Sequence, residues 1–177
     1  MRLTAFAAPL ILGALLASSV IAQPAPVAAP PAAATPPPAP PPPPYGAPIG
    51  QAAARRAIDA ALAEAARNGW DVAVAVVEPT GELVAFARID GTQYGSNAVA
   101  QQKAWTAARF RRDSKVFADA LTAGRMGVLS FDGVAAAEGG VLIVVDGKVV
   151  GAIGVSGVTG AQDAQIARAG AEAAARR

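Results

Sequence analysis

The chain has 177 residues, and its 15 basic and 13 acidic side chains give a formal net charge of +2. No run of like charge is long enough to indicate a nucleic-acid partner, so we exclude that class of partner. The sequence has no cysteine and no histidine, which excludes disulfides, Fe–S clusters, histidine-dependent catalytic triads and the commonest protein ligand of zinc and haem iron.

Residues 1–22 have the pattern of a secretory signal peptide. Arg2 supplies the positive charge, an apolar stretch follows, and Val20-Ile21-Ala22 forms a small-residue cleavage site. The apolar stretch approaches the length of a membrane span, so an uncleaved anchor is the alternative. Pro9 favours cleavage, and we therefore expect a periplasmic or secreted protein with no membrane span after the signal is removed.

Residues 23–49 form a second region, in which thirteen of the fifteen prolines lie. Such a segment cannot build a core, and it populates polyproline II and disordered conformations. We interpret it as a Pro-rich disordered linker, which leaves residues 50–177 as one domain of ordinary size.

The domain is expected to begin with a helix and a hairpin. Residues 51–69 are alanine-rich and end in the pair Asn68-Gly69, which is typical of a helix and its C-terminus. Two strands follow within residues 71–91, joined by a turn at Pro79-Thr80-Gly81. The first of these strands is apolar on both faces, so it should be central in the sheet.

Two more helices and a second hairpin complete the expected domain. Ser96 can cap a helix that runs to residue 112, and Ser114 can cap a shorter one that runs to residue 123. A short strand is predicted near residues 128–131, followed by a hairpin around Asp146-Gly147 and a final helix over 161–176. This order predicts an α+β fold with an antiparallel sheet of about five strands and the helices outside.

The apolar run after Asp146-Gly147, which includes the last predicted strand, contains Gly151, Gly154 and Gly157. Glycine weakens a strand unless something must approach its backbone closely. We expect a neighbouring helix, a second subunit or a flat ligand to make that approach.

Lys103 is the first candidate for a functional side chain. It belongs to a set that recurs at spacings of three and four along the second expected helix and therefore lines one face: Ser96, Val99, Lys103, Thr106 and Phe110. The ammonium group can point at an anionic ligand, with the Thr106 hydroxyl one turn away. Alternatively, the stem of Lys103 packs on the apolar stripe while its head reaches water.

The segment before that helix is the second candidate. It brings Arg88, Asp90 and Tyr94 close to a helix N-terminus, where backbone N–H groups and an arginine favour a carboxylate or phosphate. The alternative is an Asp-Gly turn with Arg88 and Asp90 as a surface ion pair. Gly139-Gly140, before the second hairpin, likewise indicates either a turn or a ligand loop. No acidic residues stand at metal-ligand spacing on a helix, and no pair of carboxylates is specified for hydrolysis.

Four stretches, in this order and spacing, resemble the haem-binding or haem-degrading family of GlcG and HbpS: VVEPTGELVAFARIDG, QQKAWTAA, GGVLIVVDGKVVGAIGVSG and DAQIARAG. The resemblance covers nearly all of residues 50–177. It implies a profilin-like fold, with a five-stranded antiparallel sheet between helices, and a homo-oligomer, often an octamer. It also implies haem or iron binding linked to haem sensing or degradation.

The ligand-binding set that we predict from the residues and the matching motifs is Arg88, Asp90, Tyr94, Ser96, Lys103, Thr106, Gly139, Gly140, Gly154 and Ser156. The missing histidine is a departure that excludes histidine-ligated haem. The remaining axial candidates are Tyr94, Met126, Lys103 or a threonine hydroxyl. Haem can instead be held by apolar contact and by pairing of its propionates with Lys103 or Arg88.

These observations favour an exported homo-oligomeric protein that binds haem or another anionic small molecule. One alternative is a protein or enzyme that binds a small hydroxy or keto acid, with Lys103 and Arg88 holding the carboxylate. A second alternative is an assembly scaffold without a ligand, tethered by its Pro-rich arm. The sequence supplies no evident general base or nucleophile, so it leaves catalysis open.

Overall fold

The computed structural model of the chain describes residues 40–176. The predicted signal peptide and most of the predicted linker therefore lie outside the described residues. The described helices and strands, in chain order, are α1 (Gln51–Asn68), β1 (Ala73–Val77), β2 (Leu83–Arg88), α2 (Gly95–Phe110), α3 (Lys115–Thr122), the 3₁₀ helix η1 (Met126–Ser130), β3 (Gly140–Val145), β4 (Lys148–Ser156) and α4 (Gly160–Ala175). None of these helices is long and apolar enough to cross a membrane.

The described strands form one antiparallel sheet in the order β2-β1-β4-β3. β1 has the sequence AVAVV, and all of its residues are buried because helices cover both of its faces. β3 and β4 are joined at Asp146 and Gly147, whose φ angles of 50° and 74° are those of a two-residue hairpin turn of type I′. The predicted α+β class, with an antiparallel sheet and outer helices, is confirmed.

The predicted strand near residues 128–131 is wrong. Met126–Ser130 forms the 3₁₀ helix η1, so the described sheet is 4-stranded, against a prediction of about five strands. A strand needs a neighbouring edge to satisfy its backbone hydrogen bonds. Here the N–H groups of Val128 and Phe131 donate to carbonyls three residues back, which closes tight turns beside α3 instead.

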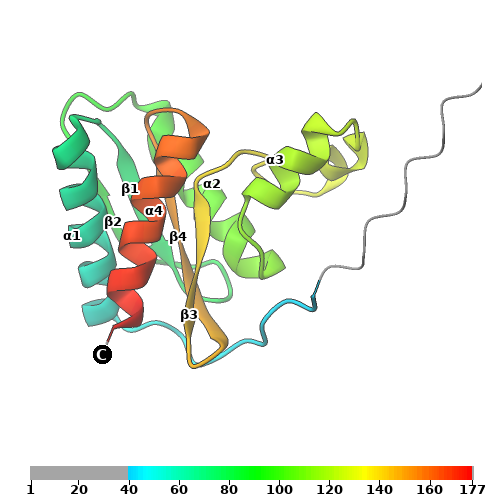
Figure 1. Cartoon of the computed structure of the whole chain (residues 1–177), viewed down its shortest axis with the longest axis horizontal. Helices are drawn as coiled ribbons and strands as arrows, with labels where there is room; N and C mark the ends of the chain where they lie inside the picture. The colour runs from blue at the N-terminus through cyan, green and yellow to red at the C-terminus, as the bar shows by residue number, and fades with distance from the viewer. Residues whose placement is uncertain (1–39, 177) are drawn as a thin grey trace, which may run out of the picture. The chain divides into compact units, whose positions relative to one another are not determined.

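α1 and α4 cover one face of the sheet, and α2 covers the other (Figure 1). The strands present large side chains to α1 and α4, among them Val74, Val76 and Ile153. They present small side chains to α2, and α2 meets them with alanines: Ala73, Ala75 and Ala152 on the strands, and Ala100, Ala104, Ala107 and Ala108 on the helix. Packing of small residues on small residues lets α2 lie close to the sheet.

This close packing explains Gly140 of β3 and Gly154 of β4, whereas Gly151 of β4 lies against Val77 and Ile49. A Cβ added at Gly154 would lie 2.1 Å from the carbonyl oxygen of Ala100, and one at Gly140 would lie 2.2 Å from that of Lys103. No real Cβ tolerates such distances, so both positions require glycine because the backbone of α2 lies against them. Of the three approaches expected from the sequence, a neighbouring helix is the one that the structure places at Gly154.

The last residues of the predicted linker lie on the folded domain. β1 pairs with β4 only as far as Ala152. The part of β4 before Ala152 pairs on that side with the segment around Tyr45, through a bridge between Tyr45 and Val149. Gly46 N donates to Val149 O, and Val149 N donates to Pro44 O, both at 2.8 Å. The Tyr45 hydroxyl donates to the carbonyl oxygen of Arg109 at 2.8 Å, which satisfies a free carbonyl at the C-terminal end of α2.

α3 and η1 form a lobe to one side of the helix–sheet sandwich (Figure 1). Phe110, at the end of α2, holds this lobe through ring contacts with Phe117 and Phe131, whose centroids lie 5.1 and 5.9 Å away. Large apolar side chains remain exposed on the lobe, and we call them the α3–η1 patch: Val116, Met126, Leu129 and Phe131.

Candidate ligand-binding groove

The ten predicted ligand-binding residues fall into two groups. One group is buried between α2, the sheet and the loop before β3: Ser96, Lys103, Thr106, Gly139, Gly140, Gly154 and Ser156. The other group is exposed on β2 and on the connection from β2 to α2: Arg88, Asp90 and Tyr94. The structure therefore does not bring all ten residues to one surface.

Lys103 lies inside the protein, with 3% of its surface exposed. Its Nζ donates to Asp163 Oδ2 at 2.7 Å and to Val155 O at 3.0 Å, and Gly139 packs against it from a third side. Burial raises the pKa of Asp163 above its ordinary value, and the ammonium of Lys103 opposes that shift. The head of Lys103 therefore does not reach water, and a ligand would have to break this ion pair to contact it.

The hydroxyl groups predicted to bind a ligand instead contact the segments that pack against α2. Thr106 Oγ1 accepts a hydrogen bond from Ala135 N at 2.9 Å, and Ser96 Oγ lies 3.2 Å from Ser156 Oγ. Ser96 is not the cap predicted for this helix, because α2 begins one residue earlier and Tyr94 occupies the N-cap position. Ser114 does precede α3, but its hydroxyl bonds to the loop before β3 rather than to the helix.

An open groove lies on the α2 side of the sheet. Cross-strand pairing puts Leu83, Phe86 and Arg88 on the face where their β1 partners meet α2. α2 packs over β1, β4 and β3, so β2 lies beyond its edge, and Leu83 and Phe86 are 49% and 38% exposed. We call this surface the β2–α2 groove, with β2 as its floor and one flank of α2 as its wall.

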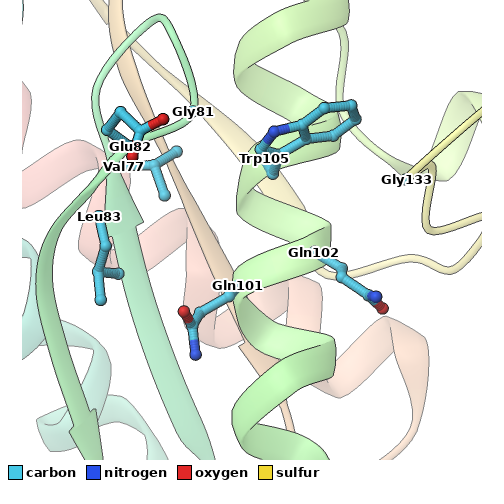
Figure 2. Close-up of a pocket in the computed structure, with 8 residues that line it drawn as sticks. All are labelled: Val77, Gly81, Glu82, Leu83, Gln101, Gln102, Trp105 and Gly133. Atoms are coloured by element: carbon cyan, nitrogen blue, oxygen red, sulfur yellow. The ribbon is translucent and has the colours of Figure 1, made fainter.

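At the turn between β1 and β2 the groove deepens into a cavity of about 320 Å³ (Figure 2). Its lining residues are Val77, Gly81, Glu82, Leu83, Gln101, Gln102, Trp105 and Gly133. Gln101 extends from α2 toward the strand that carries Leu83, as Figure 2 shows. The amide of Gln101 thus faces an apolar floor, which is a common arrangement in small-molecule sites.

Trp105 forms the apolar wall at this end. Gly81, with φ of 97°, and Gly133 lie against the two edges of its indole, where added Cβ atoms would come within 2.6 and 3.2 Å of ring carbons. The Arg109 guanidinium lies 4.8 Å from the indole centroid, a cation–π distance. This end of the groove therefore combines a large apolar surface with two opposite charges, the guanidinium of Arg109 and the carboxylate of Glu82.

The opposite end of the groove also carries a positive charge. The Arg88 guanidinium lies 5.2 Å from the centroid of the Tyr94 ring, and Tyr94 is 82% exposed. On the wall between the two ends, Gln101 and Gln102 present their amides from α2. The groove thus has an apolar floor, amides on its wall and an arginine at each end.

The groove residues that were not predicted include Leu83, Phe86, Gln101, Trp105 and Arg109. Trp105 had a usable signal, because it is the one aromatic residue in the stretch QQKAWTAA. Leu83 and Phe86 had none, since the sequence does not show which strand α2 leaves uncovered. Among residues 40–176, no group of acidic residues could hold a metal ion.

Comparison with known proteins places the chain in a family. Residues 49–172 match the family model described as haem degrading protein HbpS-like. The chain belongs to this family. Protein GlcG of Escherichia coli K12 is 41% identical over 108 residues, which cover 61% of this chain and 81% of GlcG.

Solved structures share the fold. A double mutant of HbpS from Streptomyces reticuli is 32% identical, with a TM-score of 0.67 over 83% of this chain and 97% of that one. A complex of PduOC with haem is 24% identical, with a TM-score of 0.65 over 71% of this chain and 94% of that one. Protein ORFY of Klebsiella pneumoniae is also 24% identical, with a TM-score of 0.71 over 75% of this chain and 94% of that one. The last two support the fold alone.

Proposed function

We propose that this HbpS-like protein is an exported, homo-oligomeric haem-binding protein that holds haem in the β2–α2 groove. The family description and the HbpS relative support haem as the ligand. The observation that carries the location is the exposed apolar floor of Leu83 and Phe86, which has an arginine at each end.

The groove fits the ring and the side groups of haem. Leu83 and Trp105 line the cavity, and the exposed Phe86 lies farther along β2, so all three offer apolar contact to a flat ring. The guanidinium of Arg88 or Arg109 can pair with a propionate. The cavity beside Trp105 has a volume of about 320 Å³, near the lower limit for drug-sized ligands, so a ring would extend from it along the open floor.

The groove fits the iron less well. Lys103 is already paired with Asp163, and Met126 lies on η1, so Tyr94 is the one of these three axial candidates that stands beside the groove. The hydroxyl of Thr106, the threonine predicted for the site, already donates to Gln102 O and accepts from Ala135 N. Bound haem would supply its own iron chemistry, and the groove residues would orient the ring and exclude water from its apolar face. The propionate contact, for which Lys103 and Arg88 were both predicted, is assigned to Arg88 or Arg109.

Export and assembly are parts of the same proposal. The pattern of residues 1–22 supports export to the periplasm or beyond the cell. The exposed apolar side chains of the α3–η1 patch support burial against a second copy of the chain, with an octamer as the number implied by the resemblance. The family resemblance also implies a profilin-like arrangement of the α+β fold, and we include that arrangement in the proposal.

An absorption titration of haem into the purified protein tests the ligand and the location together. We expect a saturable Soret shift, and we expect Phe86→Asp to weaken binding about tenfold or more, because it places a charge under the apolar ring. Ala52→Asp, at an exposed apolar residue of α1 outside the groove and the α3–η1 patch, is the matched control and should bind as the native protein does.

Absence of a saturable shift would overturn haem as the ligand. Thermal melts with small hydroxy and keto acids would then be the next measurement, since the carboxylate-binding arginines are independent of haem. Equal weakening by Phe86→Asp and Ala52→Asp would leave haem as the ligand but overturn the groove as its site.

A further inference from the structure

We propose that the β2–α2 groove recognises the porphyrin ring and its carboxylates rather than the iron. Its ligand class is then the flat tetrapyrrole carboxylates, with or without a metal at the centre. This inference rests on the proposed function, because it concerns the same site.

The first support is the set of side chains that can bind haem iron. Proteins use histidine, cysteine, methionine or tyrosine for this bond. The chain has no histidine, no cysteine, two methionines and two tyrosines. Among the described residues, Met126 lies on η1, and the Tyr45 hydroxyl donates to main-chain carbonyls at the end of α2. Tyr94 alone remains beside the groove.

The second support is the state of Lys103. An amine binds iron only when it is neutral and free, whereas Lys103 donates to Asp163 and Val155 and is enclosed by Gly139. Withdrawing Lys103 would leave the buried carboxylate of Asp163 without its partner, which is strongly unfavourable. Lys103 therefore keeps its structural role when a ligand enters the groove.

The third support is the position of Tyr94. Its ring lies against the guanidinium of Arg88, and its side chain is largely in water. A propionate hangs from the edge of a porphyrin, so a ring anchored at Arg88 has its edge there and its centre farther along β2, toward Phe86. Tyr94 then contacts the edge of the ring and not the metal.

The test compares haem, zinc protoporphyrin and metal-free protoporphyrin on the native protein. Binding is followed by quenching of tryptophan fluorescence, which works for all three compounds, and by the Soret band. We expect dissociation constants that agree within about threefold and a Tyr94→Phe variant whose haem spectrum is unchanged. Arg88→Ala should weaken all three compounds by the same factor, and Phe86→Asp separates binding in the groove from adsorption elsewhere.

Each outcome separates this inference from the proposed function. If haem binds about tenfold or more tightly than the metal-free ring, or if Tyr94→Phe shifts the Soret band, the iron is recognised and the inference is overturned while haem binding stands. If none of the three compounds binds, the proposed function fails as well.

Discussion

Lys103 and Arg88 carry the same charge, but their surroundings give them different roles. Lys103 is enclosed and paired with Asp163, and the pair joins α2 to the start of α4. Arg88 is exposed on an edge strand, with its guanidinium over the Tyr94 ring. A ligand can reach Arg88 without breaking the fold, whereas contact with Lys103 would separate a desolvated ion pair.

Replacing Lys103 with methionine should strongly destabilise the protein. Lys103→Met leaves the carboxylate of Asp163 buried and unpaired, so we expect the free energy of unfolding to fall by about 3–5 kcal/mol in denaturant titrations. The double change Lys103→Met with Asp163→Leu should cost less than the single change, because it removes both charges. A single variant within about 0.5 kcal/mol of the native protein would contradict a structural role for the pair.

At the scale of elements, the sequence predicted the strands and turns whose signals lie within a few neighbouring residues. The alternating valines of β1 and the Asp146-Gly147 turn have signals within a few residues, and both predictions are confirmed. The prediction of a strand near residues 128–131 is wrong, because an apolar run does not show whether the edge of a sheet lies close enough to pair with it. The groove could not be predicted for the same reason, since it exists only because α2 stops short of β2.

The packing of α2 on β4 should depend on the lack of a side chain at Gly154. Gly154→Ala would place a Cβ against the main chain of α2, so we expect a loss of about 3 kcal/mol or more in the free energy of unfolding. Gly127→Ala is the matched control, because nothing lies within 4 Å of an added Cβ there, and it should lose no more than about 0.5 kcal/mol. Equal effects of the two changes would contradict the close packing.

At the scale of the whole molecule, the apolar side chains of the α3–η1 patch lie far along the chain from the groove floor. They stand on a lobe that is joined to the sandwich through Phe110. Their exposure could not be predicted from the sequence, because it depends on whether this segment pairs with the sheet, and Met126–Ser130 does not. A chain that leaves such a surface open is suited to assembly with copies of itself.

Native mass measurements test that assembly. We expect the protein to have the mass of an oligomer, and we expect Met126→Lys with Leu129→Lys to lower it, because charges replace two exposed apolar side chains of the patch. Thr122→Lys, which changes an exposed polar residue at the end of α3, should leave the mass unchanged. A native protein with the mass of one chain would contradict assembly through the patch.

Hydrogen–deuterium exchange with and without haem tests the location of the site most directly. β2 is an edge strand, so its backbone exchanges readily unless a ligand covers it. We predict that haem slows exchange over residues 83–88 and at the start of α2, and leaves α1 unchanged. Slower exchange confined to other segments, with β2 unaffected, would contradict the β2–α2 groove as the binding site.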